Sequence, residues 1–528
     1  MYWINEKIEG IRERFKDRIS KKDPLIVREE KTLSGRVHIG SLRAAALHGI
    51  VAEKLQESGI EAKFSFEVND FDPMDGCSPD LIEEFGVHMG KPLCNVPSPD
   101  GKAENFAEYF ADIYTKVILD LGFEPVFHRA SDLYKTGKMN DVIKKSLENA
   151  PRIRELYKKI SKTEKPDDWY PFQVICPKCG KVGTSRVYDF DGEEVSFVCE
   201  ENMVSWAKGC GHKGKISPFN GNGKLPWKVE WGAKWAVLKV DVEGAGKDHY
   251  TKGGSRDITK AICNEIFDYP TPFDMPHEFI LVGGKKMSSS KGTGASADVI
   301  NELLPPEINR LLLLRKDPKK IINFDPEGET IPTLYDEFDE LERIYIENDS
   351  NKQDFIEAFK LLKTEEELKN IKTIFRPRFR ELAFIVQLPH LDLKEKLAEI
   401  KGSELTELEF TEATRRIEYL QKWLKDFAPE KYIFDISDEL KLDASLLSQT
   451  DKEVLSEILK YFEKMPEVTG HDLHGFFHSL KEKLEISPKE VFTPIYLAFL
   501  NKKEGPKAGF LLSVLDRDFV IKRLQEIL

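Results

Sequence analysis

Long apolar runs are absent from this sequence of 528 residues. A membrane-spanning helix needs about 20 predominantly apolar residues in succession, and no run approaches that length. The first residues, MYWINEKIEGIRERFKDRISKK, carry charges throughout, so the apolar centre of a secretory signal is missing too. We therefore expect a cytoplasmic protein that has no membrane partner. Its length is too great for one core and favours two to four domains.

An excess of positive charge is also missing. The net charge is -13, which argues against a protein that coats DNA without sequence preference, and we expect no DNA partner. Charge can still be segregated along the chain. The window 144–165 holds eight Lys or Arg against three Glu, which is either the solvated face of a helix or a contact to an RNA backbone.

Cysteines are few and odd in number. Seven cysteines in an intracellular context do not indicate a disulfide framework. Four of them cluster, in CPKCG (176–180), at Cys199 and in GCGH (209–212), and this spacing is typical of the two knuckles of a zinc ribbon. We predict structural zinc on Cys176, Cys179 and Cys199, with Cys210 as the favoured fourth ligand and His212 as the alternative.

Short apolar runs alternate with helical periodicity near the start of the chain. PLIV (24–27) predicts a buried strand, 43–59 predicts a helix that ends at Gly59, and EAKFSFEVND (61–70) predicts a second strand. Strand, turn, helix and strand form a βαβ unit, which implies a parallel sheet. A second block follows, with a strand predicted at WAVLKV (235–240), a helix at 255–267 and a strand at EFILVG (278–283).

Beyond about Pro305 the pattern becomes mostly helical, with apolar residues at i, i+3 and i+4. We therefore expect a Rossmann-type catalytic domain over 1–304 that carries an insertion over 80–225, a connecting region over 305–345 and an α-helical domain over 346–528. FRPRFRE (375–381) in the last part interleaves arginines with aromatics, which indicates either single-strand RNA contacts or a salt-bridge patch.

The first predicted strand runs into TLSGRVHIGSLRAAAL (32–47). Gly35 allows a tight turn, Gly40 allows close backbone approach, and a helix follows at once. The unpaired N–H groups and partial positive charge of a helix N-terminus favour a phosphate group. His38 either donates to such a phosphate or caps an ordinary helix start.

A second segment, GGKKMSSSKG (283–292), is cationic, rich in hydroxyl groups and flanked by glycines. It is either a solvated turn or a loop that closes over an anion.

Together these two segments resemble the HIGH and KMSKS signatures of class I aminoacyl-tRNA synthetases. His38–Ser41 matches the first signature, with serine in place of its last histidine. Lys286–Ser290 matches the second, with Ser289 where the family has a second lysine, and Lys291 is placed to supply that charge.

The resemblance implies that a carboxylate attacks the α-phosphate of ATP and pyrophosphate leaves. Catalysis then rests on positioning and electrostatics. His38 and Ser41 would act at the α-phosphate, and Lys286 and Lys291 at the pyrophosphate. The ATP-binding residues implied with them are Gly35, Gly40, Gly246, Asp248, Ser288, Ser289 and Ser290. Mg²⁺ is expected to arrive with ATP, since it binds mainly through phosphates and water.

Within the class, the whole chain resembles the archaeal type of class I lysyl-tRNA synthetase. The shared features are T-x-S-G-x-x-H-I-G, the zinc-bearing insertion, VEWGAKWA, GKDH, KMSSSKG and a helical end. The resemblance implies L-lysine, ATP and tRNA(Lys) as partners and a helix cage that reads the anticodon. The substrate-binding residues that we assign are Glu29, Thr32, Trp231 and His249, with Glu29 as the partner of the lysine ammonium.

Arg28 favours the alternative of a glutamate-specific enzyme of the same class, because it lies seven residues before Gly35, where glutamyl enzymes place a substrate-binding arginine. A nucleotidyltransferase that uses no tRNA and a non-catalytic tRNA-binding paralogue are further alternatives. The acidic run Asp70, Asp72 and Asp75 is either a solvated loop or a second metal site.

Overall fold

A computed structural model describes residues 2–286, 296–388, 392–434, 436, 442, 447–466 and 468–528; for Lys285, Lys286 and His471 it describes the backbone alone. By its internal contacts the chain divides into two compact units, one of Met1–Phe324 with Glu347–Ile371 and one of Asp325–Ile346 with Lys372–Leu528. No helix of the described residues is both long enough and apolar enough to cross a bilayer.

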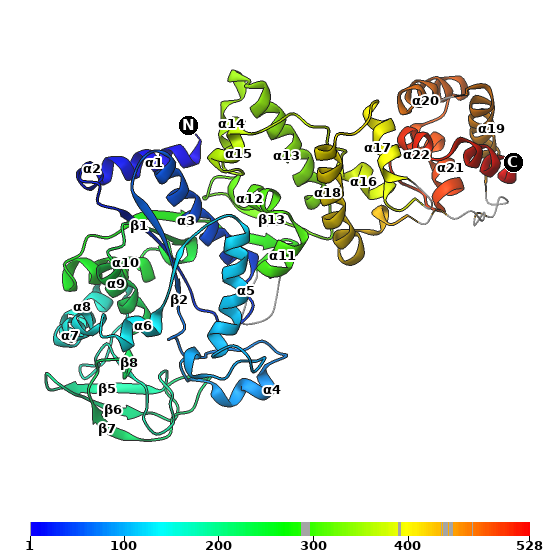
Figure 1. The fold of residues 1–528 in the computed structure, drawn as a ribbon. Coiled ribbons are helices and arrows are strands. Elements are labelled where there is room, and N and C mark those ends of the chain that lie inside the picture. The colour runs from blue at the N-terminus through cyan, green and yellow to red at the C-terminus, as the bar shows by residue number, and fades with distance from the viewer. Residues whose placement is uncertain are drawn as a thin grey trace. The chain divides into compact units, whose positions relative to one another are not determined.

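A parallel sheet of five strands forms the centre of the first unit, in the order β10-β9-β1-β2-β3. Figure 1 labels its strands β1 and β2. The strands are β1 (Leu25–Lys31), β2 (Ala62–Val68), β3 (Val126–Arg129), β9 (Val242–Gly246) and β10 (Phe273–His277). The Rossmann-type α/β fold predicted from the sequence is therefore confirmed.

Two helices connect neighbouring strands in opposite directions across this sheet. Helix α3 (Ile39–Glu57) links β1 to β2, and α10 (Ser255–Ile266) links β9 to β10. Because such crossovers are right-handed, α3 and α10 cover opposite faces of the sheet. The strand order thus reverses between β1 and β9, and in this type of fold ligands bind at the carboxyl ends of the strands at that point.

The predicted strand at 235–240 is wrong. Trp227–Leu238 forms helix α9, whose residues Val229, Ala233 and Trp235 are buried against its neighbours. A short run that is apolar on every side fits a buried helix as well as a strand, which is why the pattern misled. Lys239 ends the helix in the left-handed region, at φ 58°, and the strand of the block is β9 instead.

The run at 278–283 also lies outside the main sheet. Strand β10 ends at His277, and β11 (Ile280–Val282) belongs to a separate sheet of order β12-β11-β13, with β12 at Lys285–Lys286 and β13 at Ile322–Phe324. Conversely, β3 lies inside the range 80–225, so that range is not wholly outside the main sheet.

The remaining elements of the first unit flank the sheet or extend from it. The basic window 144–165 falls on α7 (Asn140–Glu148) and α8 (Ala150–Ser161), and the four clustered cysteines border the antiparallel sheet of β5 (Ser185–Phe190), β6 (Val195–Cys199) and β7 (Lys213–Ile216). Further helices of this unit are α1 (Trp3–Arg14), α5 (Phe106–Asp120), α11 (Ala297–Leu303) and α12 (Pro306–Leu314).

The second unit is helical in its described residues, as the sequence predicts. Several of its helices begin with a capping box, as at Thr406 with Glu409 and Ser448 with Asp451. Its helices include α13 (Thr330–Glu347), α16 (Phe379–Ile385), α17 (Leu393–Lys401), α18 (Glu407–Asp426), α19 (Gln449–Lys464), α20 (Gly470–Leu484), α21 (Pro488–Leu500), α22 (Ala508–Val514) and α23 (Arg517–Ile527).

Candidate active site

A cavity of about 470 Å³ opens at the carboxyl ends of β1, β9 and β10. The ends of the three strands contribute Glu29 to Lys31, Gly244 to Gly246 and His277, and the start of α3 contributes His38, Gly40 and Ser41. This is the point at which the strand order reverses. The cavity therefore lies where a parallel α/β sheet places a nucleotide or a small ligand.

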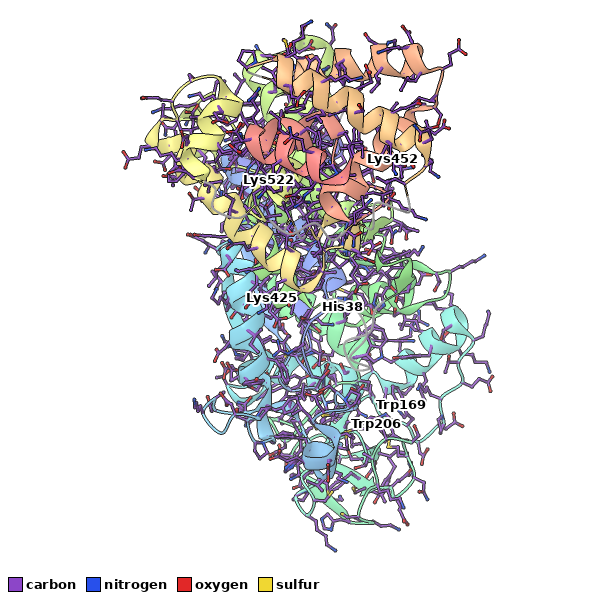
Figure 2. All side chains as sticks on the ribbon, turned by 90° about the vertical axis from the view of Figure 1, so that its right-hand side faces the viewer. His38, Trp169, Trp206, Lys425, Lys452 and Lys522 are labelled. Carbon is purple, nitrogen blue, oxygen red and sulfur yellow. The ribbon has the colours of Figure 1, made fainter. Side chains whose placement is uncertain are left out.

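His38 is the N-cap of α3 (Figure 2 labels it). Its Nδ1 accepts a hydrogen bond from the backbone N–H of Ser41, at 3.3 Å. A neutral imidazole that accepts at Nδ1 carries its proton on Nε2. His38 therefore caps the helix and also lines the cavity, so the two roles that the sequence left open are compatible.

The described backbone on either side of the lysine- and serine-rich segment pairs with strand β11 and with His38. Lys285–Lys286 pairs with β11, and Ser296 forms an isolated β-bridge with His38. Ala297 N–H donates to the carbonyl of Val37 at 2.7 Å. The predicted site residues Ser288, Ser289, Ser290 and Lys291 lie outside the described residues, as does the side chain of Lys286.

Glu29 lines the cavity and contacts His48 on α3. Its Oε2 lies 2.9 Å from His48 Nδ1, and the backbone N–H of Gly244 donates to Nε2 of the same ring at 2.7 Å. Burial acts to lower the pKa of His48 and Glu29 acts to raise it, with a net rise. Because Nε2 accepts a hydrogen bond from the N–H of Gly244, it carries no proton of its own; the ring is nonetheless neutral, and the pair keeps the negative charge of the carboxylate.

Aromatic rings form one wall of the cavity. Trp227 and Trp231 stack with centroids 6.1 Å apart, and His249 meets both rings edge-on at 5.9 and 5.4 Å. Trp235, in contrast, is fully buried and donates from Nε1 to Glu243 at 2.9 Å. Trp227 was missed from the sequence, although it lies one helical turn before Trp231; the signal was hidden by the wrong strand prediction.

His277 is a second lining residue that the sequence did not reveal. Its side chain is 7% exposed, and among the described residues its Nδ1 has no hydrogen-bond partner. Burial lowers the pKa of His277 to about 3, and the positive charge of Arg43 adds to the effect. The ring is therefore neutral near pH 7.

Most of the predicted site residues meet in this cavity. Those that line it are Glu29, Thr32, His38, Gly40, Ser41, Trp231, Gly246, Asp248 and His249. Gly35 lies in the bend that precedes α3 and is not among the described residues that line the cavity.

Comparison with known proteins agrees with this geometry. Residues 1–365 match the family model of class I tRNA synthetases (K), and residues 388–528 match the model of an anticodon binding domain. The chain belongs to the class I tRNA synthetases. The resemblance predicted from the two signatures is therefore confirmed.

Several relatives are similar to this synthetase over nearly its whole length. A lysine–tRNA ligase of Methanosarcina barkeri (strain Fusaro) is 34% identical, covering 94% of this chain and 93% of that protein. Lysine–tRNA ligase 1 of Methanosarcina acetivorans is 32% identical, covering 100% and 98%. A lysine–tRNA ligase of Methanocaldococcus jannaschii is 33% identical, covering 99% of each chain.

A buried ionic network lies directly beneath the cavity of the synthetase. Lys234 is fully buried and pairs with Glu67, with Glu30 at 3.3 Å and with Glu230 at 3.6 Å. Burial acts to raise the pKa of Glu67, but Lys234 and Arg28 hold it well below its ordinary range. Such a network is stable only while each charge keeps its partner.

Arg28 belongs to this network. It is fully buried, with Nη2 2.9 Å from Glu67 and Nη1 2.5 Å from Glu243, and it also pairs with Glu30. Arg28 is not among the described residues that line the cavity.

The acidic run at Asp70 to Asp75 is held by other groups. Asp70 accepts hydrogen bonds from the backbone and hydroxyl of Ser131, and Asp72 pairs with the buried Lys224 and accepts from Thr32 at 2.6 Å. The described residues contain no metal-binding cluster at this run.

The four predicted cysteines come together in the synthetase. The sulfur atoms of Cys176, Cys179, Cys199 and Cys210 all lie within 4.8 Å of one another, with two pairs at 3.7 Å. Four sulfurs at about 2.3 Å from a tetrahedral zinc ion would lie about 3.8 Å apart, so the spacing fits. His212 is not part of the described cluster and packs edge-on against Phe197 instead.

Cys176 and Cys179 sit in a tight turn, and the backbone of Cys199 pairs with the segment that carries Cys210. Gly180 N–H donates to the carbonyl of Cys176 at 2.7 Å, and Gly211 N–H to that of Cys199 at 2.9 Å. Both glycines have positive φ, 72° and 73°, which favours glycine at these positions. Trp206, labelled in Figure 2, covers Gly183 so closely that a Cβ there would lie 2.3 Å from the ring.

Proposed function

We propose that this synthetase is a lysine–tRNA ligase, which activates L-lysine with ATP to lysyl-adenylate and transfers the lysyl group to tRNA(Lys) in the cytoplasm. Its similarity to the three lysine–tRNA ligases described above supports this proposal. The observation that carries it is the charge of the cavity. Its described lining holds six carboxylates, Glu29, Glu30, Asp72, Glu243, Asp248 and Glu278, against one lysine or arginine, Lys31.

Glu29 is the favoured partner of the substrate ammonium. Glu30, Asp72, Glu243 and Glu278 pair with Lys or Arg side chains, which neutralise them. The ion-pair partner of Glu29 is the neutral ring of His48, so its charge is available to a cation. The rings of Trp231 and His249 border the same space, and aromatic faces attract a cation as well.

Arg28 argues against the glutamate alternative. A glutamate side chain needs a cation that reaches it, ideally in bidentate geometry. Arg28 is fully buried and already paired with Glu67 and Glu243. Using it for a substrate would take one cation away from each of these buried carboxylates, which is costly.

The chemistry that we propose needs no general base, because the lysine carboxylate is already ionised. His38 would donate from Nε2 to the α-phosphate, with Gly35, Gly40 and Ser41 shaping the turn around it. Lys286, Lys291 and the three serines would bind the departing pyrophosphate. Gly246 and Asp248 would meet the ribose, and Thr32 and His249 the amino acid. Mg²⁺ bound through the phosphates would offset their charge.

We propose zinc as a structural ion on Cys176, Cys179, Cys199 and Cys210. It would hold together the segments that carry the four cysteines, since four thiolates leave no open position for a reactant.

Charging of bulk tRNA with each of the twenty amino acids tests the proposal. We expect lysine alone to be attached, and pyrophosphate exchange into ATP to depend on lysine when tRNA is present. Glu29→Gln should raise the KM for lysine about 10- to 100-fold and leave the KM for ATP unchanged, because only the charge is removed. Attachment of glutamate, or an unchanged lysine KM in the variant, would contradict it.

A further inference from the structure

A fully buried histidine contacts the carboxylate that we assign to the substrate ammonium. His48 belongs to α3, and it is not among the described residues that line the cavity at the carboxyl ends of β1, β9 and β10. Among the described residues it is the one ion-pair partner of Glu29. Burial of such a polar ring is costly unless its polar atoms have partners.

Both nitrogen atoms of the His48 ring have polar neighbours. The backbone N–H of Gly244 donates to Nε2 at 2.7 Å, so Nε2 carries no proton and Nδ1 carries one. Nδ1 lies 2.7 Å from the carbonyl oxygen of Ala44 and 2.9 Å from Oε2 of Glu29. Because both oxygens are acceptors, the single Nδ1 proton is shared between the helix backbone and the carboxylate.

These contacts connect the ring to two strands of the sheet. Glu29 lies on β1 and Gly244 on β9, the neighbours between which the strand order reverses. Strands β9 and β10 approach each other so closely that a Cβ on Gly244 would lie 2.1 Å from the carbonyl oxygen of Met275. The partner of Nε2 is therefore tightly packed backbone, which holds the ring and its Nδ1 in one place.

The fixed ring restricts the carboxylate of Glu29. A glutamate side chain is flexible, and its carboxylate would otherwise sample several positions. Contact of Oε2 with a buried ring removes this freedom before a substrate arrives, which favours binding of a ligand that matches the fixed position. Glu29 still lines the cavity, with its side chain 15% exposed, so a ligand can reach it.

We propose that His48 is a positioning residue that sets the reach of the substrate pocket: it holds the Glu29 carboxylate where the side-chain ammonium of lysine, and not that of ornithine, reaches it. This inference rests on the proposed function, since it takes lysine as the substrate and Glu29 as the partner of its ammonium. The side chain of ornithine is one methylene group shorter. A fixed carboxylate leaves the ornithine ammonium short of contact, whereas a mobile one would follow it.

Two variants separate the two contacts of the ring. The amide group of His48→Asn takes the place of Nδ1, so it keeps a donor for Glu29 while Gly244 loses its acceptor. The amide group of His48→Gln reaches the place of Nε2, so it keeps an acceptor for Gly244 while the donor to Glu29 is lost. Both variants should have a lower Tm, but only His48→Gln should change the choice of substrate.

The measurement is pyrophosphate exchange into ATP by the full chain in the presence of tRNA, with lysine or with ornithine. We expect the original chain to prefer lysine by at least about tenfold in kcat/KM, as for one methylene group. His48→Gln should raise the KM for lysine about 3- to 10-fold, leave kcat and the KM for ATP unchanged, and reduce the preference to less than about threefold. His48→Asn should keep the KM for lysine within about twofold and keep the preference.

Leu47→Ala is the matched control for a loss of stability. Leu47 precedes His48 on α3, is 2% exposed and is not among the described residues that line the cavity. Thermal unfolding should show a lower Tm for this variant, because it leaves a gap in the core. Its KM for lysine and its preference for lysine should be those of the original chain.

The inference is overturned if the original chain does not distinguish lysine from ornithine, if His48→Gln keeps the preference, or if His48→Asn or Leu47→Ala loses it as fully as His48→Gln. The charging assay and Glu29→Gln test the proposed function separately. A chain that charges lysine through Glu29, but whose His48→Gln variant keeps the preference, would disprove the role of His48 alone. A chain that attaches another amino acid would disprove both.

Discussion

His38 and Ser296 pair through their backbones in an isolated β-bridge. The bridge joins the start of α3 to the chain that leaves the lysine- and serine-rich segment. The chain just after the second signature, at Ser296, therefore lies beside the first signature at His38, which lines the cavity. This relationship supports the proposal that both act on one triphosphate, since a contact group at each end of the phosphates is what the reaction needs.

The first prediction concerns His38. His38→Asn should keep a side-chain acceptor at the N-cap of α3 and lose the Nε2–H donor, so helix stability should change by less than about 0.5 kcal/mol. The rate of lysine-dependent pyrophosphate exchange in the presence of tRNA should fall about 10²- to 10³-fold, as when one transition-state donor is removed.

Thermal unfolding of the same variant is the companion measurement. His38→Ala should lose both the cap and the donor, and so be less stable by about 1 kcal/mol as well as slow. An asparagine variant that exchanges pyrophosphate at the original rate would show that His38 only caps the helix.

Lys234 supplies the second prediction. Its side chain is fully buried between Glu67, Glu30 and Glu230, so Lys234→Met should remove one buried cation that these three carboxylates share. We expect the free energy of unfolding to fall by about 3–5 kcal/mol in denaturant titrations.

Lys116→Met is the control for this variant, because Lys116 pairs with Asp120 at the surface with 73% of its side chain exposed. Exposed pairs of this kind contribute about 0–1 kcal/mol. Equal stabilities of the two variants would mean that the buried network does not depend on Lys234.

The order of the first strand, helix and second strand could be predicted because each step has a local signal. Apolar runs mark β1 and β2, and Gly59 ends the helical pattern close to the observed end of α3 at Glu57. The metal cluster was predictable for the same reason, since Cys176 and Cys179 form a short pair and the other two cysteines follow close behind in the chain. Helix α9 could not be predicted, because burial on all sides removes the polar face by which a helix is recognised.

The ion pairs of the site could not be predicted from the sequence. Arg28, Glu67 and Glu243 come from three different strands, and only the register of the sheet brings their side chains together. Glu29 and Glu30 are adjacent in the chain, yet one faces His48 and the other Lys234, because successive strand residues point to opposite faces. Which of them can meet a substrate therefore depends on tertiary packing.

The third prediction concerns the cysteines. The purified chain should hold about one zinc ion, measured by elemental analysis, and Cys176→Ser or Cys210→Ser should reduce this content to well below half. Cys94→Ser is the control, since Cys94 is not part of the described cluster and should leave the zinc content unchanged.

Removal of the metal by a chelator should also expose the zinc-bearing part of the chain to protease, because the ion would hold the cysteine-bearing segments together. A chain that carries no metal when purified without chelators, and whose protease pattern does not respond to one, would contradict the zinc proposal.

The fourth prediction follows from His277. Its pKa is about 3 in the folded chain and about 6.5 in an unfolded one, so between these values the unfolded state binds more protons than the folded state. Stability therefore rises with pH across this window, and His277 contributes a slope of up to about 1.4 kcal/mol per pH unit, which vanishes above about pH 6.5. His277→Asn cannot take up a proton, so the fall in unfolding free energy between pH 6 and pH 4 should be shallower than in the original chain by about that slope. Denaturant titrations at several pH values measure this slope.

His478→Asn is the matched control, because His478 is 63% exposed and its replacement should leave the slope as it was. An equal change of slope in both variants, or in neither, would show that burial does not keep the His277 ring neutral.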